Sequence, residues 1–164
     1  MPFTLLVIIT GVPITFLDPT GKFLHQYGKI WGRVGLLIAG TKGKGSVSVL
    51  CAGALQAAGY ETGLYTSPHL LRYNERVRIA GEEEDDAAIA ADFARVEAAR
   101  EATPLTYFEF GTLAALAAFE RAGVEVAVLE VGLGGRLDAV NAVDPDCAIV
   151  SSVDLDHQAW LGED

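Results

Sequence analysis

Cysteine is scarce in this sequence, which limits the disulfide bonds and the zinc sites that the protein can form. Only two cysteines occur among 164 residues, Cys51 and Cys147, and both lie in apolar runs. Neither belongs to a Cys-x-x-Cys pair or to a Cys and His spacing that is typical of zinc sites. The pattern argues against a disulfide framework and a zinc site, and we expect two buried thiols in a cytoplasmic protein.

Basic residues are also in short supply, since 12 Lys and Arg stand against 22 Asp and Glu and give a formal net charge of −10. Residues 1–60 carry five bases and one acid, whereas residues 61–164 carry seven bases and twenty-one acids. An acidic surface repels the phosphates of nucleic acids, so we expect no nucleic-acid partner. A phosphate ligand therefore needs a local feature that overcomes this field.

A long uninterrupted hydrophobic run is missing as well. Residues 1–17 are apolar, but Pro2, Gly11 and Pro13 interrupt them and they lack a basic n-region. These features argue against a signal peptide or a membrane anchor, and a buried strand or an ill-fitting start of the chain is the alternative. Hydrophobic residues make up 51% of the sequence, which is ordinary for a globular protein, and we expect no association with a membrane.

Segments with a strand pattern alternate with segments that have helical spacing of apolar residues. The predicted strands are residues 34–40, 61–65, 75–81, 124–131 and 147–153, and the predicted helices end near residues 58, 102 and 122. We interpret the acidic run 82–86 as the solvated first turn of the second helix, and Thr103-Pro104 as the start of the third. This alternation predicts a three-layer α/β fold with a mostly parallel sheet.

A glycine-rich loop joins the first of these strands to the first helix. Its residues are Gly40, Thr41, Lys42, Gly43, Lys44, Gly45 and Ser46. Glycines let backbone N–H groups converge on phosphate oxygens, Lys44 can reach the terminal phosphates, and the Ser46 hydroxyl can face Mg²⁺. The loop departs from the strict G-x-x-x-x-G-K-[ST] pattern, because Ile38 replaces its first glycine and Gly45 is inserted before Ser46. A glycine-rich turn without a ligand is the alternative.

Three further motifs follow this loop along the chain. They are Ser67-Pro68-His69-Leu70 with Asn74-Glu75-Arg76-Val77, the segment 129–141 (LEVGLGGRLDAVN), and the segment 153–162 (VDLDHQAWLG). Together with the loop, they resemble the folylpolyglutamate synthase and dihydrofolate synthase family of the Mur ligase superfamily, whose phosphate loop reads G-T-[NK]-G-K-G-S. The resemblance covers about residues 35–162 and implies the P-loop-containing central domain of a Mur ligase.

The resemblance also implies roles for individual residues. Residues 40–46 would cradle the ATP phosphates, with Lys44 as the catalytic residue, and the Mg²⁺ ligands would be Ser67, Glu130 and His157, with Ser46 as an additional contact. Hard oxygen ligands suit Mg²⁺. Glu130 lies in the apolar run Val-Leu-Glu-Val-Gly, where burial without a cation is costly, although backbone amides are alternative partners. For His157, an ordinary loop position is the alternative.

In this family, ATP phosphorylates a carboxylate of the folate, and the amine of L-glutamate attacks the acyl phosphate to form an amide. The resemblance therefore implies an ATP-dependent ligase with ATP and Mg²⁺ as cofactors and folate or dihydropteroate and L-glutamate as substrates. It implies a monomer for the full-length parent. The alternatives are a cell-wall amino-acid ligase of the same superfamily, a non-catalytic nucleotide-binding fragment and a phosphate-loop hydrolase.

Family members continue well beyond the position of Asp164. We therefore expect residues 34–164 to be a partial Mur-ligase-type ATP-binding domain and residues 1–33 to be a divergent N-terminal segment. On this hypothesis the chain is a fragment, and we do not expect it to be active alone.

The sequence leaves the roles of three residue pairs open. Arg136 and Asp138 either pair with each other or contact phosphate. Arg76 and Arg78 fit a solvated strand face equally well, and His69 and Tyr73 either line the entrance for folate or belong to a plain loop.

Overall fold

The computed structural model describes residues 6–8 and 34–155. Its elements are β1 (Leu6–Ile8), β2 (Val34–Ala39), α2 (Lys44–Ala57), β3 (Thr62–Tyr65), the 3-10 helix η1 (Tyr73–Arg76), β4 (Val77–Ile79), β5 (Glu82–Glu83), α3 (Asp86–Arg100), α4 (Tyr107–Ala122), β6 (Val126–Glu130), the 3-10 helix η2 (Ala139–Ala142) and β7 (Cys147–Val150). The predictions for His157 and for most of residues 1–33 lie outside the described residues. None of the described helices combines the length and the apolarity that crossing a lipid bilayer demands.

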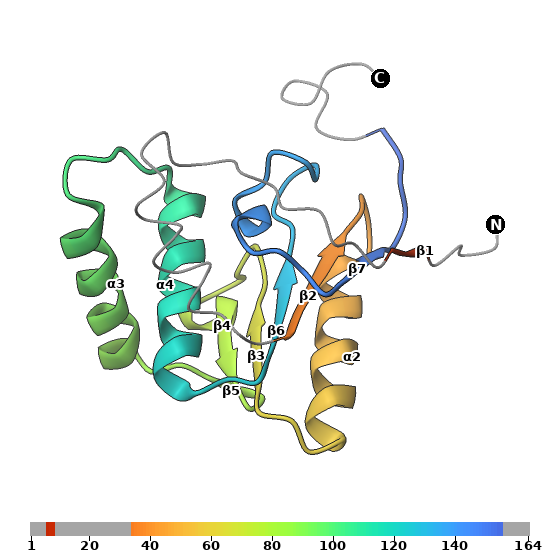
Figure 1. Ribbon diagram of the computed structural model, residues 1–164, viewed down its shortest axis with the longest axis horizontal. Helices are drawn as coiled ribbons and strands as arrows, with labels where there is room; N and C mark the ends of the chain where they lie inside the picture. Colours follow the sequence, from red (N-terminus) through yellow and green to blue (C-terminus); the bar gives the residue numbers. More distant parts are fainter. Residues whose placement is uncertain (1–5, 9–33, 156–164) are drawn as a thin grey trace.

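The described strands form one sheet in the order β1-β7-β2-β6-β3-β4-β5 (Figure 1). The four central strands β7, β2, β6 and β3 are parallel to one another. At one edge of the sheet, β4 pairs antiparallel with β3, and β5 pairs antiparallel with β4. At the other edge, β1 pairs antiparallel with β7. The predicted α/β fold with a mostly parallel sheet is therefore confirmed, and because parallel strands end at the same edge, the loops after β2, β3, β6 and β7 gather there.

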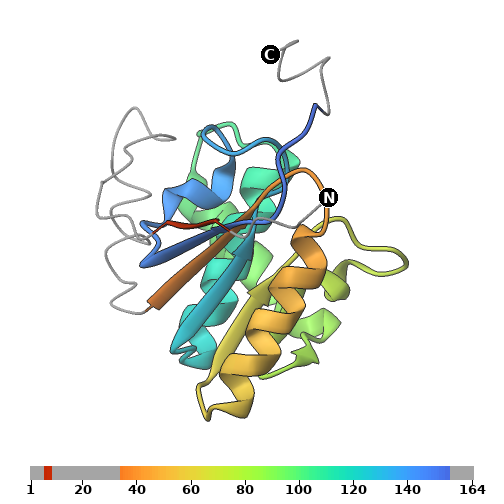
Figure 2. The same ribbon diagram turned by 90° about the vertical axis from the view of Figure 1, so that its right-hand side faces the viewer.

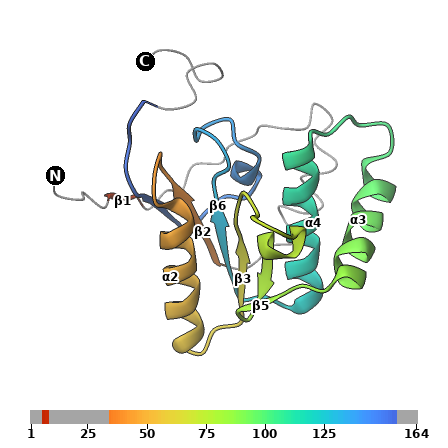
Figure 3. The same ribbon diagram turned by 180° about the vertical axis from the view of Figure 1, so that it is seen from behind.

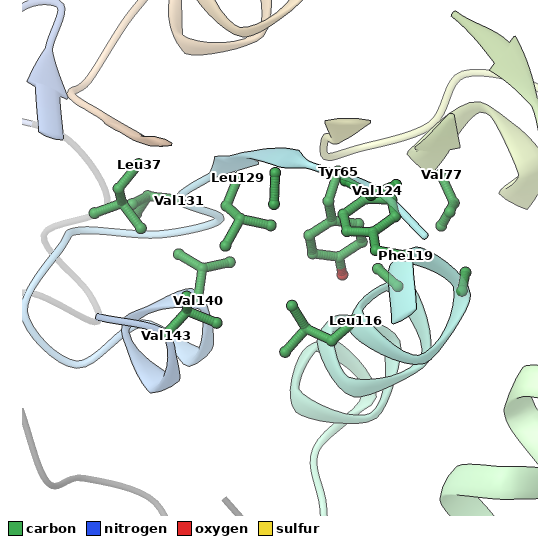
Figure 4. Close-up of a cluster of buried hydrophobic side chains, with 13 residues drawn as sticks. Leu37, Tyr65, Val77, Leu116, Phe119, Val124, Leu129, Val131, Val140 and Val143 are labelled. Atoms are coloured by element: carbon green, nitrogen blue, oxygen red, sulfur yellow. The ribbon is translucent and has the colours of Figure 1, made fainter. Parts of the chain in front are cut away.

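Alternate residues of the central strands pack against helices on opposite faces of the sheet. Ile38, Leu64 and Val128 form a buried cluster with Ala52 of α2. Their neighbours Leu37 and Leu129 face the other way and belong to a larger cluster with α4 and η2 (Figure 4). The third layer is extended by α3, which packs on the outside of α4 through the cluster of Val96, Leu113 and Ala114 (Figures 1 and 3). On the opposite face, α2 covers the sheet (Figure 2).

Two predicted helix starts need correction. The helix predicted from Thr103-Pro104 begins at Tyr107, because the Thr106 hydroxyl and the Glu109 carboxylate cap each other's backbone N–H groups there. The acidic run 82–86 is only partly a helix start. Glu82 and Glu83 form β5, and the helix starts after Asp85, whose side chain accepts the N–H of Ala88 at 2.8 Å.

Gly63 of β3 lies directly under the ring of Phe119 in the large cluster. A Cβ at this glycine would lie 2.7 Å from Phe119 Cδ1 and 2.8 Å from Cε1. Gly63→Ala is therefore expected to lower the free energy of unfolding by about 1–3 kcal/mol through overpacking, measured by urea denaturation. The matched control is Gly53→Ala in α2, where nothing lies within 4 Å of the added Cβ, and a gain of up to ~1 kcal/mol is expected. Equal effects of the two changes would contradict this packing.

Candidate functional site

The glycine-rich loop turns the chain from the end of β2 into the start of α2. Gly40 has a φ of 130° and Gly43, the residue before α2, a φ of 82°, both in the region that favours glycine. The first turn of α2 has neither a side-chain cap nor an acidic residue. Its backbone N–H groups and its helix dipole therefore favour an anion at this end, as the sequence predicts for phosphate.

The chain after β7 braces this loop. The backbone N–H of Thr41 donates to Ser152 O at 2.6 Å, and the Ser151 hydroxyl donates to Lys42 O at 2.7 Å. The Thr41 hydroxyl exchanges hydrogen bonds with the backbone of Asp154, at 3.0 Å as donor and 2.9 Å as acceptor. These contacts fix the loop from a segment about 110 residues away, which the sequence analysis did not find.

Lys44 lies across the loop. Its ammonium group donates to Gly40 O at 2.8 Å, from the first residue of α2 back to the end of β2. The charge of this group also lowers the pKa values of the Glu130 and Asp138 carboxyls, both of which burial raises more strongly. The charge of Lys44 thus opposes the effect of burial on both acids.

Glu130 brings the loop together with the segment after β3. It is the last residue of β6, is 4% exposed, and pairs in register with Ile38 of β2. Its Oε2 accepts the backbone N–H of Ser67 at 3.0 Å, and both carboxylate oxygens lie 3.6 Å from the position of a Cβ on Gly45. Burial is the main cause that raises its pKa, while the Ser67 bond and Lys44 oppose this effect. The structure thus gathers Glu130, Ser67 and the start of α2 at one edge of the sheet.

Comparison with known proteins identifies the family. No protein-family model matches the chain. The chain is 55% identical over 127 residues to the dihydrofolate synthase/folylpolyglutamate synthase of Escherichia coli (strain K12). The aligned residues make up 77% of this chain and 30% of that protein. It is 42% identical over 132 residues to the folylpolyglutamate synthase of Lacticaseibacillus casei, over 76% of this chain and 31% of that protein.

Solved structures agree. The E. coli FolC structure in complex with DHPP and ADP superposes with a TM-score of 0.84 at 45% identity, over 95% of this chain and 38% of that chain. The chain belongs to the dihydrofolate synthase/folylpolyglutamate synthase family. It spans about 30% of the length of these curated relatives and corresponds to their N-terminal part.

The structure brings together only two of the four predicted metal ligands among the residues that it describes. Ser67 and Glu130 lie together, as described above. Ser46 is exposed in the first turn of α2, and His157 lies outside the described residues. Within residues 34–155 no three His, Cys, Asp or Glu side chains cluster to hold a metal. A carboxylate and a hydroxyl nevertheless fit Mg²⁺, which binds proteins through one or two carboxylates and keeps water and phosphate oxygens as its other ligands.

Asp138, in the family segment 129–141, shapes the loop after β6. Its carboxylate accepts the backbone N–H groups of Leu133 at 2.9 Å and Val140 at 3.1 Å, and it begins η2 as a cap. Asp138 is 8% exposed, whereas Arg136 is exposed, and the ion pairs found among residues 34–155 do not include this pair. Of the open alternatives, the structure thus rejects the Arg136–Asp138 pair, and Asp138 orients its loop through backbone amides.

Arg76 and Arg78 differ sharply, although the sequence treats them alike. Arg78 is half-buried and pairs with Glu83 across the β4–β5 hairpin at 2.8 Å. Arg76 is 8% exposed, and its Nε donates to Nδ1 of His69 at 2.8 Å. The solvated strand face is therefore wrong for Arg76. The strand pattern did not reveal this because Arg76 ends the 3-10 helix η1, where the alternation of a strand does not apply.

Proposed function

We propose that this chain is the ATP-binding part of an ATP-dependent ligase that joins L-glutamate to a folate or to dihydropteroate. The observation that carries the proposal is the convergence of Glu130, Ser67 and the uncapped start of α2 at the glycine-rich loop. The relatives support the substrate class, since one solved relative is described with Mn, AMPPNP and L-glutamate bound and another as a complex with AMPPCP and folate.

The proposed reaction has two steps. A carboxylate oxygen of the folate attacks the γ-phosphorus of ATP, ADP leaves, and an acyl phosphate forms. The amine of L-glutamate then attacks the acyl carbon, an amide forms, and phosphate leaves. This chemistry needs no nucleophilic side chain, so the task of Lys44 and the loop N–H groups is to position the phosphates and neutralise the charge that develops on them.

We further propose that Glu130 and Ser67 hold Mg²⁺ beside the phosphates, with Ser46 and His157 as further ligands. The ion, when bound, neutralises charge on the transferring phosphoryl group. Residues 34–164 are then a partial Mur-ligase-type ATP-binding domain, with residues 1–33 as a divergent N-terminal segment. The need for ATP and the two free cysteines support a cytoplasmic location, and the full-length parent is proposed to be a monomer.

Titration calorimetry of MgATP into the chain tests the proposal directly, and binding is expected. Absence of binding would contradict it. If ATP binds, release of ADP is then measured with dihydropteroate or folate, with and without L-glutamate. Turnover that needs both substrates identifies the ligase, and turnover without any amino acid identifies a hydrolase. Binding without turnover identifies a nucleotide-binding part, and turnover with a cell-wall precursor in place of folate identifies the other branch of the superfamily.

Glu130→Gln separates the metal role of this carboxylate from a structural one. The raised pKa means that the folded state holds the proton of Glu130 to a higher pH than the unfolded state does. The free energy of unfolding of the wild type therefore falls as pH rises from the ordinary carboxyl range through this raised pKa. A glutamine does not ionise, so the variant does not lose stability in this way. In EDTA the variant is expected to be more stable than the wild type at pH 8, measured by urea denaturation.

The same variant is expected to bind MgATP about 10-fold more weakly, because the Mg²⁺ contact is lost. ATP without Mg²⁺ should bind both proteins equally, which is the control. A variant that loses stability and keeps its Mg²⁺ dependence would show that Glu130 serves only to hold the Ser67 backbone.

A further inference from the structure

The two cysteines are far apart in the sequence, but both belong to the side of the sheet that α2 covers. Both are free thiols, and both are partly buried. Cys147 is the first residue of β7 and pairs in register with Leu36 of β2. Ile149, two residues further along β7, packs with Leu36 against the buried cluster that faces α2. Since residues i and i+2 of a strand share a face, the side chain of Cys147 also lies on the α2 face.

Cys51 faces the same strands from α2. It packs against the same buried cluster. Two other residues of α2 show how the helix is turned, because Gly45 faces the Glu130 carboxylate of β6 and the Gln56 side chain donates to Ala80 O, beyond β4, at 2.7 Å. At 3.6 residues per turn, Cys51 lies about 120–140° around the helix from both of them. In the strand order β7-β2-β6-β3-β4, a side chain that packs on the sheet from this side of α2 faces β2 and β7.

The two cysteines also match in height along the sheet. Helix α2 runs antiparallel to β2 (Figure 1), and its residue Gly45 lies beside Glu130, which pairs with Ile38. From this level, Cys51 is about 9 Å along the helix and Leu36 is about 7 Å back along the strand. Cys51 is therefore nearly level with Leu36 and with Cys147, which pairs with Leu36.

The electrostatics of the thiols agree with this placement. Burial raises the pKa of the Cys51 thiol, and Cys147 raises it further. A group of like charge has this effect only when it is close by. At neutral pH the Cys51 side chain therefore stays a protonated thiol with a second thiol beside it.

We propose that Cys51 and Cys147 form a site of reversible oxidation, whose disulfide ties α2 to β7. The oxidant is a small-molecule disulfide such as oxidised glutathione. The thiolate of one cysteine attacks a sulfur of the oxidant, and a mixed disulfide forms as one glutathione thiolate leaves and takes up the proton. The thiolate of the other cysteine then attacks the protein sulfur of the mixed disulfide, and the second glutathione leaves in the same way. Two protein thiols are oxidised, and one disulfide is reduced to two thiols.

The position of this bond gives it a consequence for the glycine-rich loop. Helix α2 begins at the loop, and β7 leads directly into Ser151 and Ser152, which brace it. The disulfide therefore joins the two elements that meet at the loop. It also closes a segment of roughly 100 residues, which restricts the unfolded chain and stabilises the folded one. The inference does not depend on the proposed function, because neither ATP nor folate takes part in the oxidation.

Oxidation of the full chain with oxidised glutathione at pH 8, followed by alkylation of free thiols and mass spectrometry, tests the inference. The monomer is expected to lose two hydrogen atoms and to take up no alkylating agent, and digestion should give one peptide that joins Cys51 to Cys147. Dithiothreitol should restore both thiols. Products that stop at mixed disulfides, or disulfide-linked dimers in place of the internal bond, would overturn the inference.

Two controls show whether the folded structure brings the thiols together. Cys51→Ser and Cys147→Ser each leave one thiol, so they are expected to give only a mixed disulfide. Wild type oxidised in urea, above its unfolding midpoint, should form the internal bond more slowly than the folded protein does. This second control needs no variant, and a faster reaction of the unfolded chain would contradict the proposed proximity.

Urea denaturation of the oxidised and the reduced wild type measures the effect of the bond. The midpoint is expected to rise by about 1–2 M on oxidation and to return after dithiothreitol. A lower midpoint would show that the bond forces α2 and β7 out of place, and this would overturn the inference. Titration of MgATP into the reduced protein reports the proposed function separately, so either proposal can fail while the other stands.

Discussion

Lys44→Ala is expected to lower the affinity for MgATP about 100-fold. Charge-assisted hydrogen bonds contribute about 1.5–3 kcal/mol each, and Lys44 is the cation at the start of α2, where the loop N–H groups and the helix dipole already favour phosphate. Its ammonium group lies 2.8 Å from Gly40 O, within the loop that would hold the phosphates. Calorimetric titration of MgATP into wild type and variant measures the effect.

Lys42→Ala is the matched control, because it removes an equal charge from an exposed side chain of the same loop. Since its backbone N–H remains to contact phosphate, a loss of at most a few-fold is expected. Equal losses for the two variants would mean that the loop attracts ATP only through its net charge. An affinity that Lys44→Ala leaves intact would refute the phosphate-binding role of the loop.

The sequence predicted the central layers well, because the signals for them are local. The apolar run 34–40 ends at glycine, and the segment after it has helical spacing, so strand, loop and helix could be placed without knowing any long-range contact. The edges were harder to predict. Glu82 and Glu83 look like a solvated helix start, and only the pairing of β5 with β4, which sets Glu83 opposite Arg78, makes them a strand.

The site was predicted in its residue types and less well in its contacts. The loop, Ser67 and Glu130 carry recognisable patterns, and the structure brings them together. The brace from Ser151 and Ser152 joins residues about 110 positions apart, and two serines after an apolar strand carry no signal of their own. The role of Arg76 stayed open for a similar reason, because its contact with the ring of Tyr107 comes from a different helix.

Gly40→Ala is expected to cost about 2–5 kcal/mol of unfolding free energy and to abolish measurable MgATP binding. The φ of 130° at Gly40 is strained for any residue with a Cβ, which costs about 1–3 kcal/mol. An added Cβ would also collide with the Ser151 hydroxyl and lie 2.8 Å from Ser152 O, and relieving such a collision costs about 1–3 kcal/mol more. The loop can relax only by breaking the hydrogen bond from the Thr41 N–H to Ser152 O, which helps to hold its phosphate-facing shape.

Gly43→Ala separates the two causes. Gly43 also has a positive φ, 82°, but nothing lies within 4 Å of an added Cβ, so this variant has the backbone strain without the collision. It should lose about 1–2 kcal/mol, measured with Gly40→Ala by urea denaturation, and should still bind MgATP with reduced affinity. If Gly40→Ala cost no more than Gly43→Ala, the segment after β7 would not brace the loop. A larger loss at Gly40 would show that the phosphate site depends on chain that follows it by about 110 residues, so that the loop alone is not a sufficient ATP site.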